Sequence, residues 1–179
     1  MSAIPIEPTI QARPNYPAET TVKKMRDSVY SLIAVMLCSI AHASTLELSI
    51  VDETGESLPC RILVRGSDER CAVPEGATTL QTGRDLWFMS SGKCRVEIPN
   101  GDATVRVERG PEYVRIKERF RIGSDSESKT YRLRRWIDMR QRGYMCGENH
   151  LHVDTVQIAP MLVAEGLDFG SSLTWWRGP

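Results

Sequence analysis

The residue types best suited to chemistry lie near the end of the sequence, in the stretch GENHLHVD. His150 and His152 stand two positions apart, and Glu148 precedes them by the same step. Side chains two residues apart on a β-strand point to the same face, so a strand would project all three together. Neutral imidazoles and carboxylates are ligands for divalent metals such as zinc, manganese or iron. This spacing predicts His150, His152 and Glu148 as metal ligands.

The predicted metal site is incomplete on the sequence alone. A catalytic zinc generally takes three protein ligands and keeps one position open. Because a strand rises about 3.3 Å per residue, Glu148 and Asp154 would lie about 20 Å apart and cannot both reach one ion. The only other histidine, His42, falls in a predicted leader. Two exposed histidines without a metal are therefore the alternative to a metal site.

The histidines are expected at the end of a strand that opens a strand–helix–strand unit. Residues 144–154 have the pattern of a strand, and apolar residues then recur at three- and four-residue steps, which predicts a helix. Asp154 or Thr155 is placed to cap the helix, Pro160 is expected near its first turn, and Gly166 is expected to end it. Residues 169–176 follow as a second strand. Such a unit usually pairs its two strands in parallel.

The preceding part of the sequence, residues 45–134, has the pattern of an antiparallel sheet protein. Leu46, Leu48 and Ile50 alternate with polar residues, and turn-forming stretches separate about seven such strands. This pattern predicts a small antiparallel β-sandwich. Trp87 belongs to a Trp-Phe pair that we assign to the core rather than to a ligand-stacking platform.

The N-terminal part of the sequence resembles a secretory leader. Lys23, Lys24 and Arg26 form a basic segment, an apolar run of residues 29–41 follows, and an Ala-x-Ala pattern ends at Ala43. The run is shorter than the about 20 apolar residues that cross a membrane. The sequence thus predicts export without a stable membrane anchor, with translation starting at Met1 or at Met25. A buried helix is the alternative.

Four cysteines follow the predicted leader, and an oxidising compartment would permit them to pair. They are Cys60, Cys71, Cys94 and Cys146. Four cysteines allow three pairings. Cys60 with Cys94 is the preferred pair because both lie in strand-like runs, and four free thiols are the alternative.

Charge gives little evidence for a particular partner. The formal net charge is +0, so no nucleic-acid partner is expected from bulk charge. A run of arginines could hold phosphate, but we favour the interpretation that it is a solvated strand edge and linker. These arginines are Arg132, Arg134, Arg135, Arg140 and Arg142.

The stretch from residue 136 to 176, with GENHLHVD at its centre, resembles the opening of the PHP (polymerase and histidinol phosphatase) metallohydrolases. The resemblance is closest to the exported branch related to carbaryl esterase. In that branch a transthyretin-like or carboxypeptidase regulatory-like sandwich precedes the catalytic barrel, and VDETGESLPCRILV is similar to part of it. The resemblance implies that His150 and His152 are first-strand ligands of a metal that activates water to hydrolyse an ester or phosphoester.

Two departures from that family limit the expected activity. The family's T-D-H motif on the second strand is replaced here by Thr174, Trp175 and Trp176. The barrel-like part is also far shorter than the about 250 residues of a common (β/α) barrel. The resemblance therefore implies a truncated enzyme, inactive as this chain, that lacks a C-terminal barrel segment and whose substrate is unknown.

The expected architecture is mainly β, with a small antiparallel β-sandwich followed by a truncated βαβ start of an α/β barrel. The expected division is a lead and signal peptide at 1–43, a β-sandwich at 44–135, and an incomplete metallohydrolase domain at 136–179. The alternative function is a non-catalytic secreted β-sandwich module that binds carbohydrate or protein.

Overall fold

The computed structural model describes residues 43–123 and 125–173. The predicted leader lies outside these residues except for Ala43, where the first strand begins. The departure from the T-D-H motif at Thr174–Trp176 also lies outside them.

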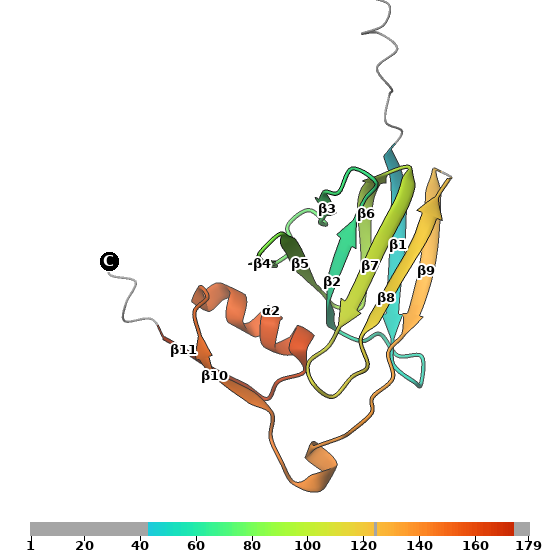
Figure 1. Cartoon of the computed structure of the whole chain (residues 1–179). Coiled ribbons are helices and arrows are strands. Elements are labelled where there is room, and N and C mark those ends of the chain that lie inside the picture. Colours follow the sequence, from blue (N-terminus) through green and yellow to red (C-terminus); the bar gives the residue numbers. More distant parts are fainter. Residues whose placement is uncertain (1–42, 124, 174–179) are drawn as a thin grey trace, which may run out of the picture. The chain divides into compact units, whose positions relative to one another are not determined.

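Strands make up most of the described chain (Figure 1). The strands up to residue 132 are β1 (Ala43–Val51), β2 (Cys60–Arg65), β3 (Cys71–Ala72), β4 (Thr79–Thr82), β5 (Asp85–Ser90), β6 (Lys93–Pro99), β7 (Gly101–Glu108), β8 (Ile116–Ile122) and β9 (Ser126–Arg132). A short 3₁₀ turn, Arg140–Arg142, follows. The C-terminal elements are β10 (Gly147–Leu151), α2 (Thr155–Glu165) and β11 (Phe169–Ser172). The prediction of a mainly β protein is confirmed.

The first nine strands form two sheets. The smaller has the order β6-β1-β9, and the larger has the order β4-β5-β2-β7-β8 with β3 paired to β2. All pairs in the larger sheet are antiparallel. In the smaller sheet β1 is antiparallel to β6 but parallel to β9. The expectation of a purely antiparallel sandwich is thus corrected at one pair, since β9 returns to β1 from a distant part of the sequence.

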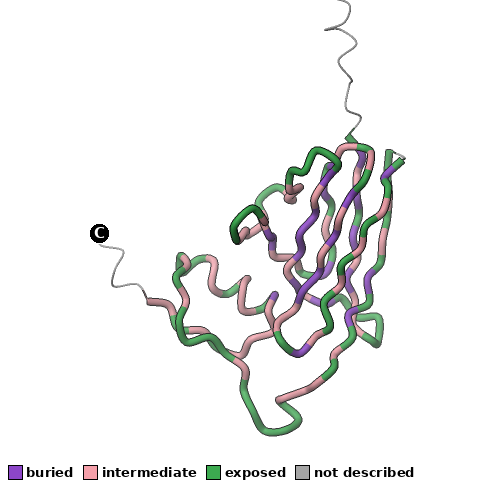
Figure 2. The backbone as a smooth tube through the Cα atoms, in the orientation of Figure 1, coloured by how far each residue is buried: buried purple, intermediate pink, exposed green. Residues whose placement is uncertain are grey.

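The hydrophobic core draws on both sheets, as expected for a sandwich. Leu46 and Ile50 of β1 are fully buried in one cluster with Ile62 of β2 and Val105 of β7. Along β1, buried residues alternate with more exposed ones, as the sequence pattern predicted (Figure 2). Burial of apolar side chains from both sheets is the main force that stabilises this arrangement.

The C-terminal elements form the predicted strand–helix–strand unit. β10 and β11 pair in parallel, and α2 connects them. Gly166 adopts a left-handed conformation at the end of α2, where its N–H bonds to carbonyls of the last turn. Pro160 lies in the interior of the helix rather than near its first turn, so that expectation was wrong. β10 and β11 form a sheet of two strands, and the start of an α/β barrel is not shown.

Two further expectations concern export. None of the helices in the described ranges has the length and apolar character needed to cross a bilayer. All four described cysteines are free thiols, so the preferred Cys60–Cys94 pair is not formed in this structure.

Candidate functional site

The two predicted metal-binding histidines lie together at the C-terminal end of β10. The Nε2 atoms of His150 and His152 are 2.6 Å apart, and the two rings meet edge to face with 4.4 Å between centroids. One ring therefore donates an N–H to the lone pair of the other. The structure brings these two side chains together, as the two-residue spacing on a strand predicted.

The third predicted ligand, Glu148, is oriented differently. Its Oε1 accepts a hydrogen bond from the backbone N–H of His150 at 3.0 Å. The carboxylate is therefore held beside the strand backbone rather than beside the two imidazoles. Among residues 43–123 and 125–173, no group of three or more His, Cys, Asp or Glu is arranged to hold a metal ion. The donor set fits at most half of a catalytic zinc site, and metal binding here stays a prediction.

The C-terminal end of α2 is fastened to the sandwich by charged side chains. Nη1 of Arg109 donates to the carbonyl oxygen of Val163 at 2.7 Å. One oxygen of Glu165 accepts the N–H of Gly110 at 3.0 Å, and the other lies 2.9 Å from Nη1 of Arg61. Gly110 has a positive φ of 49°, and a Cβ there would collide with the carbonyl of Glu165. Glycine is thus required for this close approach.

Trp87 lies where α2 packs on the larger sheet. It is buried, and the guanidinium groups of Arg61 and Arg106 stack over its ring at 4.9 and 4.6 Å. Neighbouring Phe88 is fully buried in the core between the sheets. The expectation that this aromatic pair is structural rather than a ligand platform is consistent with these positions.

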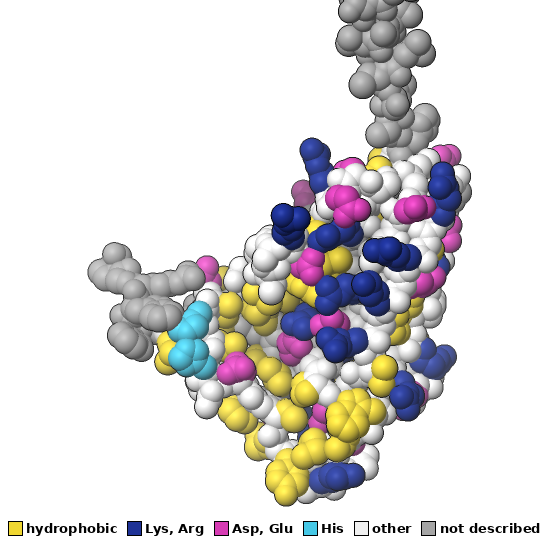
Figure 3. Space-filling view, viewed as in Figure 1, with side chains coloured by type: hydrophobic (Ala, Val, Ile, Leu, Met, Phe, Trp, Pro, Cys, Tyr) yellow, Lys and Arg dark blue, Asp and Glu magenta, His cyan; other side chains and the backbone are white. Residues whose placement is uncertain are grey.

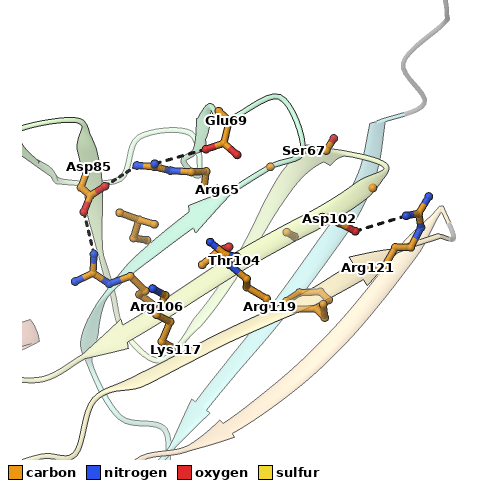
Figure 4. A pocket seen from close by; sticks show the side chains of 15 residues that line it. Arg65, Ser67, Glu69, Asp85, Asp102, Thr104, Arg106, Lys117, Arg119 and Arg121 are labelled. Atoms are coloured by element: carbon orange, nitrogen blue, oxygen red, sulfur yellow. Dashed lines mark hydrogen bonds and ion pairs between the residues drawn. The ribbon is translucent and has the colours of Figure 1, made fainter.

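A groove opens on the outer face of the larger sheet, and the sequence patterns alone did not identify it. Its volume is about 800 Å³, and its lining comes from β2, β5, β7, β8 and the loop after β2 (Figure 4). The charged residues of the lining are Arg65, Glu69, Asp85, Asp102, Arg106, Lys117, Arg119 and Arg121. Five of these are cationic and three are acidic, so the groove has an excess of positive charge.

Strand register explains why these cations share one face. Arg65 of β2 pairs with Thr104 of β7, and Thr104 pairs with Arg119 of β8. Two residues further along the ladder, on the same face, Arg106 pairs with Lys117. Cross-strand partners project to the same side of a sheet, so residues far apart in sequence form rows across the groove. In Figure 3 the dark blue side chains gather over β7 and β8.

Some of these cations are neutralised by acids within the sheet. The carboxylate of Asp85 lies 2.5 Å from Arg65 and 2.9 Å from Arg106. Glu108 lies 2.5 Å from Arg61 and 3.0 Å from Arg106. Burial acts to raise the pKa of Glu108, but the hydrogen bonds from both arginines hold it below its ordinary value. The two arginines thus favour the ionised form of Glu108, which joins Arg61 of β2 to Arg106 of β7.

The cations of β8 are different. Within the described part of the chain, Lys117 and Arg119 make no ion pair, and both side chains are exposed. Arg121 is 3.6 Å from Asp102, but both are highly exposed, and such a pair contributes little. Two adjacent cations on the groove wall thus carry charge that the neighbouring acids leave uncompensated.

Three of the five arginines that could have held phosphate, Arg132, Arg135 and Arg140, have other partners. Arg132 donates to the backbone carbonyls of Asp52 and Glu53. Arg135 pairs with Glu112. These contacts fix the segment after β9 and argue against a phosphate patch there.

The sequence held one usable signal for the groove. VRIKERFRI, whose last seven residues form β8, largely alternates apolar and charged residues, which predicts a strand with a charged outer face. The partners of that strand depend on long-range register, so the groove could not be assembled from sequence alone.

Comparison with known proteins gives no family assignment. No family model matches the chain, and no curated protein matches it. Two solved structures are similar in part. BcpA, the major pilin subunit of Bacillus cereus, is 13% identical with a TM-score of 0.36, over 52% of this chain and 30% of that one. The Bacillus anthracis TIE protein is 14% identical with a TM-score of 0.36, over 64% of this chain and 19% of that one.

The expected resemblance to PHP metallohydrolases is contradicted by these comparisons. They return a pilin subunit and a TIE protein, and no metallohydrolase. The H-x-H motif supplied the correct local geometry but the wrong family. The expectations of an α/β barrel start and of a missing barrel segment were both inferred from that family. They are therefore withdrawn with it. This chain spans less than a third of the length of either solved structure.

Proposed function

We propose that this chain is a non-catalytic, exported β-sandwich module that binds an acidic, extended segment of a partner protein. The observation that carries the proposal is the row of uncompensated cations, Lys117 and Arg119, on the groove wall. Export is supported by the leader-like pattern of basic and apolar residues that ends at Ala43.

The spacing of the cations favours an extended peptide. Lys117, Arg119 and Arg121 are each two residues apart on one strand, so they repeat about every 6.6 Å. An extended peptide with acidic residues at alternate positions has the same repeat. Its carboxylates could therefore meet successive cations of β8 without distortion of either chain.

The expected interaction is electrostatic and of modest strength. Each exposed ion pair contributes about 0.2–1 kcal/mol, so several pairs are needed for measurable affinity. Because such pairs are screened, binding should weaken strongly between about 50 mM and 500 mM salt. Complementary charge would mainly select the partner and accelerate its association.

The test is a calorimetric titration with a short synthetic peptide in which glutamate alternates with serine. Binding at low salt is expected, with none to the peptide in which glutamine replaces glutamate. The paired substitution Lys117→Glu and Arg119→Glu should abolish binding. The matched control is Lys93→Glu with Arg95→Glu, which makes the same change at the same spacing on β6 of the other sheet.

Two results would contradict the proposal. An equal loss of peptide affinity in both paired variants would indicate nonspecific attraction to positive charge. Unchanged affinity in the Lys117/Arg119 variant would exclude the groove as the binding site. Binding of polygalacturonate without binding of the acidic peptide would assign the groove to an acidic polysaccharide instead.

A further inference from the structure

We propose that Cys60 and Cys94 form a disulfide that joins the two sheets when the protein folds under oxidising conditions. Cys60 lies in β2 of the larger sheet and Cys94 in β6 of the smaller one. Both are free in this structure, so the bond is a modification of the fold described above.

The β5–β6 connection brings the two cysteines close together. β5 ends at Ser90 and β6 begins at Lys93, so only two residues carry the chain from the larger sheet to the smaller one. Cys60 is the cross-strand partner of Ser90, and Cys94 directly follows Lys93. Stacked sheets lie about 10 Å apart, whereas the Cα atoms of a disulfide lie about 4.4–6.8 Å apart. Because only two residues connect β5 to β6, the two sheets must lie closer together at this end than stacked sheets usually do.

The turn itself is packed tightly against the strands that carry the cysteines. Gly92 has a φ of 107°, and a Cβ there would lie 2.7 Å from the backbone nitrogen of Leu58. The carbonyl oxygen of Gly92 also accepts the N–H of Ile50 at 2.6 Å, and Leu58 donates to Ile50 at 3.0 Å. Leu58 stands two residues before Cys60, and Gly92 two residues before Cys94. The turn therefore fixes both cysteines at one end of the core.

Both thiols face the interior between the sheets. Cys60 is fully buried in the core cluster, and Cys94 packs against that cluster from the opposite sheet. Cys94 shares its face of β6 with buried Val96 and Ile98. The two side chains are thus aimed into the same space from opposite walls.

The other cysteines have different neighbours. Sγ of Cys71 lies 4.0 Å from the carbonyl oxygen of Arg84, and Sγ of Cys146 lies 3.7 Å from Glu112. Neither belongs to the core cluster at the β5–β6 turn. The pairing is therefore expected to be selective.

The reaction is a thiol–disulfide exchange with a small disulfide such as oxidised glutathione. One cysteine thiolate attacks the oxidant and releases one glutathione thiol, giving a mixed disulfide. The second cysteine thiolate then displaces the second glutathione thiol and closes the Cys60–Cys94 bond. The two protein thiols are oxidised, and one glutathione disulfide is reduced to two thiols, which take up the two protons.

The timing of the reaction follows from burial. Burial raises the pKa of Cys60 to about 12 and that of Cys94 to about 11, so both stay protonated in the folded protein. Only the thiolate attacks a disulfide. We therefore expect the bond to form during folding, before the core closes, and to form slowly once the reduced protein has folded.

The test is to refold the reduced, denatured protein in a glutathione redox buffer, alkylate it, and map its peptides without reduction. The expected result is a cross-linked Cys60–Cys94 species with Cys71 and Cys146 alkylated. Alkylation of both Cys60 and Cys94, or a cross-link that involves Cys71 or Cys146, would overturn the proposal. This readout requires no ligand, so it is independent of the proposed binding function.

Matched variants extend the test. The double variant Cys71→Ser, Cys146→Ser should retain the cross-link, and Cys94→Ser should lose it. Added reductant should lower the thermal midpoint of the refolded wild-type protein and of the double variant, but not that of Cys94→Ser. A midpoint insensitive to reductant in all three proteins would contradict the bond.

Discussion

Oε1 of Glu165 lies 2.9 Å from Nη1 of Arg61, so the last residue of α2 is bonded to the second strand of the sandwich. The other oxygen of the same carboxylate accepts the N–H of Gly110 from the connection after β7. A single side chain thus links the helix to β2 and to the connection after β7.

Removal of that charge should weaken the attachment of α2. Glu165→Gln keeps the side-chain shape but loses the ion pair, and we expect the free energy of unfolding to fall by about 1–2 kcal/mol. Urea denaturation followed by circular dichroism measures the change. Glu75→Gln, the same substitution at an exposed loop position, is the control and should have no measurable effect. Equal effects of both substitutions would contradict this role of Glu165.

Truncation of a core residue of β1 should lower the free energy of unfolding much more. Leu46→Ala leaves a cavity among fully buried neighbours, and we expect the free energy of unfolding to fall by about 2–5 kcal/mol. Glu47→Ala, at the exposed position next to it, should change stability by less than about 0.5 kcal/mol. The midpoints of urea unfolding compare the two, and a Leu46→Ala protein as stable as wild type would refute the assignment of that face to the core.

Stability should decrease in acid because of Glu108. Its folded-state pKa is held below the ordinary value of 4.5, so its contribution is fully present above that value and is lost as pH falls through the lowered folded-state pKa. The measurement is the urea midpoint at a series of pH values from neutral to strongly acidic. Glu108→Gln should be less stable than wild type at neutral pH, and the difference should shrink in acid. A constant difference would contradict the mechanism.

Zinc binding should be weak and should depend on both histidines. Two imidazoles without a third described ligand offer fewer bonds than a complete site, so calorimetry should show lower affinity than three-ligand zinc sites have. The double variant His150→Ala, His152→Ala should lose binding. Glu148→Gln should retain most of it, because that carboxylate bonds to the backbone of His150. Tight binding lost in Glu148→Gln would instead show that the carboxylate is a ligand.

Local patterns predicted the elements well because their causes are local. The alternation of Leu46, Leu48 and Ile50 reports directly on burial of one face of β1. The helical steps after Asp154 and the stop at Gly166 likewise predicted α2. The interior position of Pro160 was missed, because sequence patterns place helix boundaries less reliably than helices themselves.

Features that depend on distant partners were not predicted. The parallel partner of β1 is β9, whose own sequence does not reveal which strand it joins. The groove requires Arg65, Thr104 and Arg119 to align across three strands, and no short sequence motif predicts that register. The H-x-H step of His150 and His152 predicted which way two side chains point. It did not determine the protein family, because many unrelated strands can present two histidines in this way.

The parallel pairing of β1 with β9 affects how the sandwich would respond to mechanical force. In a parallel pair, the beginning of one strand and the end of the other lie at opposite ends of their shared ladder. Tension applied through the chain before Ala43 and after Arg132 would therefore load all the hydrogen bonds between them in shear, at the same time. An antiparallel pair pulled from one end would open one bond after another. The parallel hydrogen-bonded pairing of β1 with β9 should thus make this small domain resistant to stretching along its strands.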